Sequence, residues 1–420
     1  MLVVSSVIGV GVFLTPGAVA NLLPHPGVFL AAWFAGGLLS LAGALANAEL
    51  GAMYPHAGGD YVYLRAAYHP FAGFAAGWLS FFVIYAGTVA TLAIGVAEGL
   101  GLFIELSAGA KLAIAIAVTI GTSWINFIGV RSGARFNNLT AAIKIGGLIA
   151  LVLGGVIVGD GHLSHLQPLV EGAGELPVSS FGLALSPVLF SYLGWNASVY
   201  VASEIRDPER NIPRSLFAGL LLCTAIYLAV NALYLYALPI DVLRATPRAG
   251  EAAARALFGD VGGTIVALLV LASTLGCLNA TILVGPRIAY AMALDGLFLR
   301  GVERVHEINQ TPHVAITVQA LTAIGLLLLL QRFPSVLDYT TFAIVLATIA
   351  DTGALYTLRR RQPDRRRPYH AWGYPFVPAF YLVANLGIAV AMMLGRPLEC
   401  GIALAVLATA VPFYVVLSRR

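Results

Sequence analysis

Long apolar stretches alternate with short polar segments along the whole chain. A helix needs about 20 apolar residues to cross the hydrocarbon core of a bilayer. Twelve stretches are close to this length or exceed it, near residues 2–22, 28–53, 71–100, 112–130, 138–158, 182–203, 215–238, 262–293, 314–331, 335–358, 375–395 and 400–418. The pattern predicts an all-α polytopic membrane protein, with twelve transmembrane helices in a single transmembrane domain over residues 1–420.

Glycines interrupt two of these stretches. Gly9-Val10-Gly11 lies within the apolar run 3–13, and residues 191–194 (Ser-Tyr-Leu-Gly) form a counterpart in the second half of the chain. Within lipid, a non-helical backbone is tolerated where its freed N–H and C=O groups face a cavity or a polar ligand. Interrupted spans at corresponding places in two chain halves predict the substrate site of a transporter. The half-helix before the first interruption is short, as expected of a chain whose natural start lies further upstream.

The composition agrees with a membrane environment. Of the 420 residues, 59% are hydrophobic and 10% are charged, and the mean hydropathy is +0.86. A soluble globular domain has about 25% charged residues. The composition therefore excludes a soluble globule, and the net charge of +4 is interpreted as a consequence of membrane topology rather than of nucleic-acid binding.

The cationic residues predict the orientation, because cytoplasmic loops carry an excess of Lys and Arg. One set of predicted helix ends and loops holds Arg65, Arg131, Arg135, Arg206, Arg210, Arg214, Arg287, Arg300, Arg304, Arg359, Arg360, Arg361, Arg365, Arg366, Arg367, Arg419 and Arg420. The opposite set holds Lys111, Arg244, Arg248, Arg255, Arg332 and Arg396. The asymmetry predicts a multi-pass protein of the plasma membrane with both termini in the cytoplasm.

The two interruptions have a chemistry of their own. A half-helix that ends exposes unpaired carbonyls, and a half-helix that begins exposes unpaired N–H groups, with about half a unit charge of each sign. Together they suit a zwitterion. The amides of Val10 and Gly11 are candidates for binding a carboxylate, and the candidates for accepting an ammonium group are the carbonyls of Val7, Phe190, Ser191 and Leu193. The alternative is that the glycines only permit close helix packing.

Five motifs follow one another along the chain. They are residues 7–13 (Val-Ile-Gly-Val-Gly-Val-Phe), 48–61 ending in Gly-Gly-Asp-Tyr, 192–214, 276–298 and 358–375. In this order they resemble the amino acid/polyamine/organocation superfamily, and within it the L-type amino acid transporter branch. The resemblance covers nearly the whole chain.

The resemblance implies a five-plus-five inverted repeat. Spans 1–5 (residues 1–158) and spans 6–10 (182–358) would form the two repeats, with spans 1 and 6 unwound at the midplane, followed by two further spans over 375–418. It also implies that the Val10 and Gly11 amides bind the substrate carboxylate, that the span 6 carbonyls bind the amine, and that Phe190 is an aromatic gate; Gly9 belongs to the same predicted substrate site. Phe190 as ordinary apolar packing is the alternative.

Two positions depart from the pattern of the superfamily. Val10 stands where relatives usually have Ser or Thr, so the amide is kept but a hydroxyl contact is lost and the pocket shrinks. Leu193 replaces a smaller or polar residue. We therefore expect recognition of the amino acid backbone to be kept and side-chain selectivity to differ.

Lys144 is isolated within the apolar stretch 138–158. A charged lysine near the middle of a bilayer costs at least about 2.5–3.5 kcal/mol, so we expect it to face the protein interior and to have partners. Snorkelling to the membrane surface is the alternative. The resemblance implies that this lysine occupies the place of a sodium ion and bridges span 1 to span 8. The candidate partners are the Gly9 carbonyl and the side chains of Ser273, Thr274 and Cys277.

The acidic residues favour a neutral substrate. Glu49, Glu204, Asp295 and Asp351 fall at or near predicted inner ends, and no carboxylate was placed beside either interruption. A cationic substrate would need such a carboxylate, because an unpaired charge in an apolar pocket is costly. Glu49 and Glu204 are candidate proton carriers, although pairing with the arginines of the same loops is the favoured interpretation.

The sequence predicts a sodium-independent secondary transporter or exchanger of amino acids, with neutral L-amino acids as the favoured substrates. The alternatives are a proton-coupled carrier of polyamines or cationic amino acids and a non-transporting nutrient sensor or subunit. No enzyme is expected, because no nucleophile, base and orienting group share a recognisable spacing. No cofactor or metal is predicted either, since Gly9-x-Gly11 lacks the context of a dinucleotide loop.

Overall fold

The computed structural model describes residues 2–56, 58–101, 103–170, 176–330 and 333–418, which fold into helices without any β-strand. The helices of the first half are α1 (Leu2–Val7), α2 (Gly11–Leu14), α3 (Pro16–Leu22), α4 (Pro26–Met53), α5 (Asp60–Ala67), α6 (Pro70–Leu79), the π-helix η1 (Ser80–Tyr85), α7 (Ala86–Leu100), α8 (Ala108–Phe127), α9 (Val130–Ile157) and the 3-10 helix η2 (Leu163–Leu166). Those of the second half are α10 (Val178–Ser191), α11 (Ala197–Tyr200), the 3-10 helix η4 (Ala202–Glu204), α12 (Pro208–Ala237), α13 (Ile240–Arg244), α14 (Ala249–Val284), α15 (Pro286–Leu294), α16 (His313–Leu330), α17 (Phe333–Arg361), α18 (Phe376–Gly395) and α19 (Pro397–Leu417).

Most of these helices match the predicted apolar stretches. In the part of the chain that the structure describes, nine helices are long and apolar enough to cross a membrane. The bent pair Leu2–Leu14 and Pro16–Leu22, with an angle of 58° between its halves, makes ten if it counts as one span, and Val178–Ser191 and His313–Leu329 are shorter apolar helices. The all-helical membrane fold is confirmed, while the count of twelve spans and the inverted repeat stay predictions.

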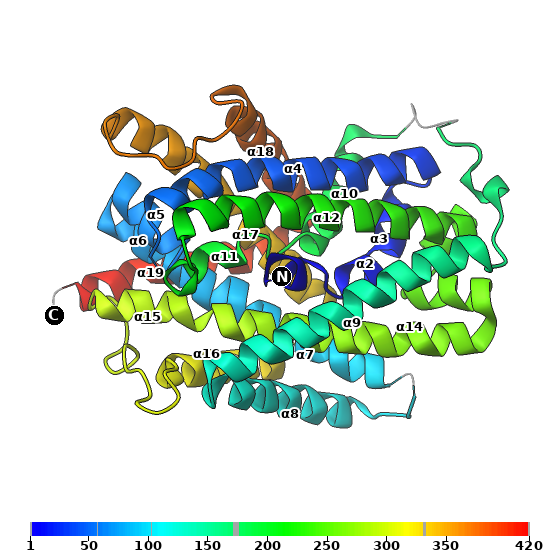
Figure 1. The fold of residues 1–420 in the computed structure, drawn as a ribbon, viewed down its shortest axis with the longest axis horizontal. Coiled ribbons are helices and arrows are strands. Elements are labelled where there is room, and N and C mark those ends of the chain that lie inside the picture. The colour runs from blue at the N-terminus through cyan, green and yellow to red at the C-terminus, as the bar shows by residue number, and fades with distance from the viewer. Residues whose placement is uncertain (1, 57, 102, 171–175, 331–332, 419–420) are drawn as a thin grey trace.

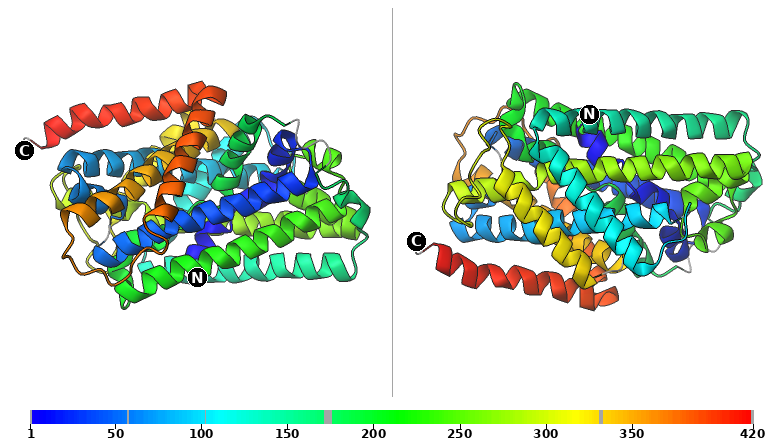
Figure 2. Two further views of the ribbon diagram at one scale, coloured as in Figure 1. Left: turned by 90° about the horizontal axis from the view of Figure 1, so that it is seen from above. Right: turned by 90° about the horizontal axis from the view of Figure 1, so that it is seen from below.

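The long helices form one bundle in which the short helices of the chain's beginning are enclosed. α4 runs alongside α12, and α14 packs against α9 (Figure 1). α1 packs against α9, α12 and α14, and α10 packs against α3, α4, α17 and α18. The last helix, α19, lies at the edge of the bundle in both views of Figure 2. The two interrupted segments are therefore held in the interior by long helices.

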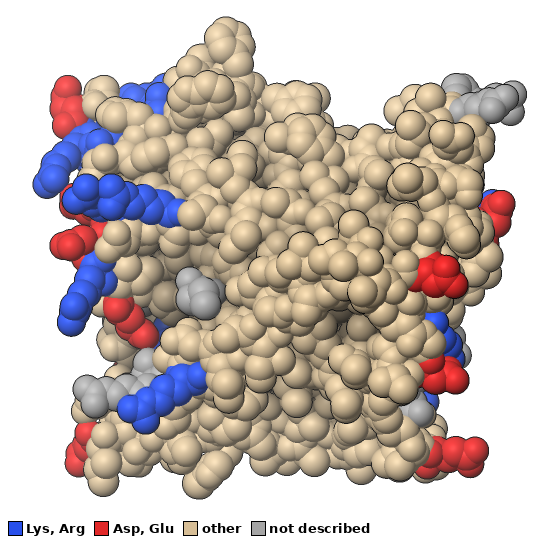
Figure 3. All heavy atoms as spheres, turned by 45° about the vertical axis from the view of Figure 1, so that its right-hand side comes forward, with Lys and Arg blue, Asp and Glu red and all other residues tan. Residues whose placement is uncertain are grey.

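The surface of the bundle has the division expected of a membrane protein. Charged side chains gather at two opposite ends, and the wide belt between them carries other residues (Figure 3). Apolar side chains such as Leu153, Val383 and Val411 are exposed on α9, α18 and α19. Such a belt is a liability in water but matches lipid. Of the arginines used to predict the orientation, Arg332, Arg419 and Arg420 lie outside the described residues, as does the side chain of Arg131.

Candidate substrate site at two broken helices

The helix breaks lie at the glycine patterns and touch each other. α1 ends at Val7 and α2 begins at Gly11, while α10 ends at Ser191 and α11 begins at Ala197. A Cβ atom at Gly11 would lie 2.5 Å from Ser191 Oγ and 2.7 Å from Ser191 Cα. At Gly194, where φ is +90°, a Cβ atom would lie 2.9 Å from the Ser6 carbonyl oxygen. These two glycines therefore allow the two broken segments to cross in backbone contact.

Two hydroxyl side chains join the breaks, and neither was predicted from the sequence. Tyr227 Oη on α12 lies 2.7 Å from the Val7 carbonyl oxygen and 2.8 Å from that of Ser191, so its single hydrogen can be donated to either. Thr15 Oγ1 lies 2.9 Å from Ser191 Oγ and donates to the Gly11 carbonyl at 2.9 Å. Tyr227 thus ties the end of α1 to Ser191 at the end of α10, and Thr15 ties the start of α2 to Ser191 as well.

One cavity lies at the crossing of the broken helices. Its lining includes the predicted substrate-binding residues Val7, Gly9, Val10, Gly11, Phe190, Ser191 and Leu193, together with the predicted coupling residue Cys277. Gly11 is the first residue of α2, so its N–H has no acceptor within that helix. Apolar side chains from α7, α14 and α17, among them Leu92, Val284 and Val345, complete much of the wall. The structure therefore brings together all the residues that the sequence assigned to substrate binding.

A second cavity lies on the other side of Val10. It is lined by residues of α2 and α3 and by the charged side chains of Glu98, Arg244, Arg248, Glu251, Asp338 and Arg396. Val10 lines both cavities. The first break thus borders two cavities, one of which has several charged side chains in its lining.

Lys144 on α9 is fully buried and is anchored at the end of α1. Its Nζ donates to the Ser5 carbonyl at 2.8 Å and to the Ile8 carbonyl at 2.7 Å, and it lies 3.5 Å from Cys277 Sγ. Because its exposed fraction is 0%, the snorkelling alternative is wrong. The bridge from span 1 to α14 is present, but the contacted carbonyls are those of Ser5 and Ile8, in place of the predicted Gly9 carbonyl.

The predicted coupling residues of α14 take different roles. Ser273 Oγ donates to the Ile8 carbonyl at 3.3 Å, and Cys277 Sγ lies 3.3 Å from the carbonyl oxygens of both Ser5 and Ile8. Thr274 instead donates to Val270 within its own helix, at 2.7 Å. Lys144, Ser273 and Cys277 therefore surround the unwound end of α1, whereas Thr274 does not contact it.

Comparison with known proteins agrees with this geometry. A family model described as an amino acid permease matches residues 1–416. The chain belongs to the amino acid permease family. The permease is 30% identical over 423 residues to the serine/threonine exchanger SteT of Bacillus subtilis (strain 168), covering 100% of this chain and 95% of that protein.

Mammalian relatives are similar over almost the same length. The permease is 28% identical to the large neutral amino acids transporter small subunit 2 of Mus musculus, covering 98% of this chain and 78% of the relative. It is 28% identical to the human b(0,+)-type amino acid transporter 1, covering 94% and 81%. The predicted membership of the amino acid/polyamine/organocation superfamily and its L-type branch is confirmed.

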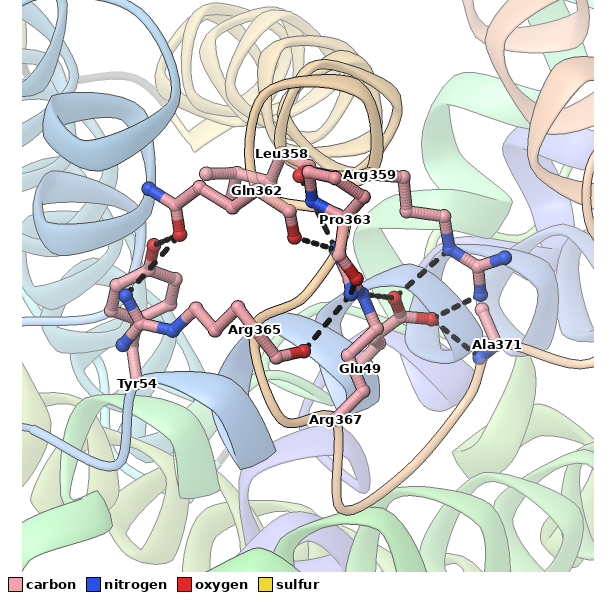
Figure 4. A network of polar contacts seen from close by, with 9 residues as sticks. All are labelled: Glu49, Tyr54, Leu358, Arg359, Gln362, Pro363, Arg365, Arg367 and Ala371. Carbon is pink, nitrogen blue, oxygen red and sulfur yellow. Dashed lines mark hydrogen bonds and ion pairs between the residues drawn. The ribbon is translucent and has the colours of Figure 1, made fainter.

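The two glutamates considered as proton carriers are paired with arginine. Glu49 on α4 is fully buried in the permease and contacts Arg359 and Arg367, and it accepts the Ala371 amide at 2.7 Å (Figure 4). Glu204 Oε1 lies 3.2 Å from Arg287 Nε. The favoured interpretation, in which these carboxylates pair with arginines, is confirmed.

One carboxylate of the permease was missed. Asp60 and Tyr200 both line the cavity at the breaks, and Tyr200 Oη donates to Asp60 Oδ2 at 2.6 Å. The premise that no carboxylate lies beside the breaks is therefore wrong. Asp60 follows span 2 in the sequence, and only the folding of α5 back into the bundle brings it there. The tight Gly58-Gly59 turn before it was the available signal.

Proposed function

We propose that this permease is a secondary transporter or exchanger of neutral L-amino acids that works by sodium-independent alternating access. The observation that carries the proposal is the meeting of both broken segments at one cavity, with a buried lysine anchored to the same break. The family and the names of the relatives support amino-acid transport as such. Both termini are proposed to be cytoplasmic, with residues 1–158 and 182–358 as the two repeats.

In the proposed complex, main-chain groups recognise the amino acid backbone. The amides of Val10 and Gly11 bind the substrate carboxylate, since the start of a helix offers unpaired N–H groups. The carbonyls of Val7, Phe190, Ser191 and Leu193 bind the ammonium group. Tyr227 supports this arrangement, because its hydroxyl already contacts the Val7 and Ser191 carbonyls and holds them close together.

Lys144 is proposed to replace a sodium ion in the transport cycle. Its ammonium group contacts two carbonyl oxygens at the end of α1, which is the ligand chemistry that suits a monovalent cation. A covalently attached charge at this position supplies the link between α9, α1 and α14 without an ion from solution. We therefore expect transport to proceed equally in sodium and in choline buffers.

A carrier of cationic amino acids or polyamines is the second candidate. Asp60 favours it, because this carboxylate lines the same cavity and is available in principle to a distal amine. The neutral substrate is preferred because Asp60 already accepts a hydrogen bond from Tyr200 and because relatives are named for neutral, serine and threonine substrates.

Uptake by the purified permease in liposomes tests these proposals. A radiolabelled panel with serine, threonine, leucine, lysine and putrescine is offered with and without internal amino acid, in sodium and in choline. We expect neutral amino acids to enter, faster with internal substrate, and without any requirement for sodium. Lysine or putrescine as the preferred substrate would select the second candidate, and ligand binding without uptake of any compound would identify a sensor.

Two substitutions test the site itself. Gly11→Ala forces a Cβ atom into Ser191 and should abolish uptake, while Gly387→Ala on α18, where a Cβ atom meets nothing within 4 Å, should leave uptake unchanged. Lys144→Ala should abolish uptake, whereas Lys111→Ala, outside the cavity, should not. If Gly11→Ala takes up substrate at the wild-type rate, the carboxylate site is misplaced. If Lys144→Ala does so, Lys144 has no role in coupling.

A further inference from the structure

Two aspartates from distant parts of the chain meet inside the permease. Asp60 is the first residue of α5, and Asp351 lies within α17, which packs against α5. Their exposed fractions are 2% and 0%. The two carboxyl groups lie within hydrogen-bonding reach of each other. Two carboxylates in contact and out of water cannot both be ionised without a large electrostatic cost.

The donors around the two carboxyl groups are unequal. Asp60 Oδ2 accepts from Tyr200 Oη at 2.6 Å and from Ser80 Oγ at 3.5 Å. Asp351 has the Asn47 side chain nearby, but neither of its carboxyl oxygens has a hydrogen-bond donor in place among the described residues. The Asn47 amide is itself buried and has no hydrogen-bond partner in the part of the chain that the structure describes. The environment stabilises a negative charge on Asp60 better than on Asp351.

Among the described residues, no cation compensates the pair. In the described part of the chain, neither Asp60 nor Asp351 forms an ion pair with Lys or Arg. The nearby arginines are engaged elsewhere, since Arg359, about two turns further along α17, pairs with Glu49, and Arg65 on α5 pairs with Asp295.

In the described part of the chain, the other ionisable groups that face the pair are tyrosines. They come from α5 and its end, η1, α11 and α18, and they are Tyr63, Tyr68, Tyr85, Tyr200 and Tyr381. A tyrosine has an ordinary pKa near 10 and is neutral in the physiological range. A charge on the aspartate pair therefore has no partner of opposite sign among the residues that the structure describes.

We propose that Asp60 and Asp351 form a proton-binding site, in which Asp351 carries one proton and donates it to ionised Asp60. The next step rests on the transport function proposed above. α5 and α17 separate during the transport cycle, and the exposed pair then releases the proton. Return to the conformation described here requires the proton again. Transport therefore depends on pH through this pair.

The geometry around Asp60 links the site to the substrate cavity. Gly59, with φ of +50°, lies against the Tyr200 ring, where a Cβ atom would be 2.4 Å from Tyr200 Cε1. This close approach allows the Tyr200 hydroxyl to reach Asp60. Tyr200 belongs to α11, directly after the second helix break, and lines the cavity together with Asp60. Movement of the broken segment therefore acts directly on a donor of the pair.

A proton fits this site better than a metal ion. Calcium takes six to eight oxygen ligands, and magnesium demands a near-octahedral shell. No group of three or more His, Cys, Asp or Glu side chains that could hold a metal occurs among the residues described. A single proton needs only a donor and an acceptor, which the two carboxyl groups supply by themselves.

Infrared spectroscopy of the reconstituted permease tests proton binding without requiring transport. A protonated carboxyl group has a carbonyl band that a carboxylate lacks, so we expect a band that disappears as pH rises and that is absent from Asp351→Asn. Asp338→Asn, at a partly buried carboxylate paired with Arg396, is the control and should keep the band. If Asp351→Asn does not fold, Asp351→Glu should shift the band instead.

Uptake over a pH series with equal pH on both sides tests the coupling. Wild-type uptake should fall as pH rises, by up to about tenfold per pH unit for one proton, whereas Asp351→Asn, a permanently neutral donor, should transport with a flat profile. A band insensitive to Asp351 substitution, or one displaced by sodium or calcium, would overturn the proton site. A band that behaves as expected while no substrate is transported would overturn the proposed function and leave the proton site standing.

Discussion

Glu49 and the Asp60–Asp351 pair are buried carboxylates with opposite surroundings. Glu49 is surrounded by two arginines and a backbone amide, which are supplied by α17 and by the segment that follows it (Figure 4). The aspartates are buried to the same degree, but they face each other and uncharged donors. The role of a buried carboxylate is therefore decided by the charges that compensate it and not by burial alone.

As a consequence, α17 is held by two different connections, one that does not depend on protonation and one that does. α17 carries both Asp351 and Arg359. An ion pair with several charge-assisted hydrogen bonds holds its partners regardless of modest changes in pH. A shared proton is kept only while the two carboxyl groups stay together and out of water. We infer that the Glu49 network anchors the end of α17, whereas the aspartate pair allows α5 to leave and to return.

Loss of the Glu49 charge should have the largest effect. Glu49→Gln leaves two partly buried arginines without their fully buried carboxylate partner, and breaking a buried ion pair costs about 3–5 kcal/mol. The midpoint of unfolding in detergent should drop accordingly. Glu209→Gln removes the exposed ion pair with Arg366 and should cost about 0–1 kcal/mol. Equal effects of the two variants would mean that the Glu49 network is not an anchor.

The Tyr200 hydroxyl should matter next. Tyr200→Phe removes the 2.6 Å hydrogen bond to Asp60, and hydrogen bonds to charged groups contribute about 1.5–3 kcal/mol. Since the ionised form of Asp60 loses its donor, the proton should also stay bound to a higher pH in the infrared titration. Tyr63→Phe is a matched control, because the Tyr63 hydroxyl is buried and has no hydrogen-bond partner among the described residues. A titration curve of Tyr200→Phe that coincides with that of Tyr63→Phe would contradict this role.

The pH dependence of the free energy of unfolding distinguishes the Asp60–Asp351 pair from the Glu49 network. Burial raises the pKa of the Asp60 carboxyl, and its hydrogen bonds with Asp351 and Tyr200 offset part of that rise. Because the two buried carboxyl groups cannot both ionise, the folded pair holds the proton on Asp351 to higher pH than the unfolded chain does. Its contribution to stability is complete below the ordinary aspartate pKa of 3.8 and is lost as pH rises through the raised value.

The slope of this loss is at most about 1.4 kcal/mol per pH unit for one proton. Thermal unfolding midpoints of the wild type should therefore decrease with pH across this window, and those of Asp351→Asn should decrease less. Identical pH curves for the two proteins would show that the pair does not titrate in the folded state.

The sequence was sufficient to predict features that can be recognised within a single apolar helix. Gly9 and Gly11 interrupt one apolar run, and Lys144 is a lone charge in another, so each is anomalous without any knowledge of its neighbours. The expense of a buried charge or of an unwound backbone in lipid makes such anomalies informative. The helix breaks and the burial of Lys144 were predicted for this reason.

Two features that depend on contacts between distant segments, the aspartate pair and the role of Tyr227, were not predicted. Asp60 follows a span and Asp351 was assigned to a helix end, so each looked like an ordinary loop or interfacial carboxylate. Tyr227 is one aromatic residue in an apolar run, and only the approach of both breaks gives its hydroxyl a role. The hydrophobic pattern specifies which segments are helical, but it does not specify how α5 and α17 are brought together.

The smallest effect concerns an arginine of the Glu49 network that does not touch Glu49. Arg365 stacks on Tyr54, with its guanidinium carbon 3.9 Å from the ring centroid, and donates to the Met53 carbonyl at 3.2 Å. A cation–π contact at a partly exposed site is worth about 0.5–1 kcal/mol, so Arg365→Ala should lower the unfolding midpoint slightly and leave the pH profile of uptake unchanged. Arg367→Ala, which removes a direct partner of Glu49, should cost several times more. Equal destabilisation of the two variants would mean that the whole arginine segment, and not only the direct partners of Glu49, anchors the end of α17. The contrast between Glu49 and the aspartate pair would then no longer depend on the charges that contact each carboxylate.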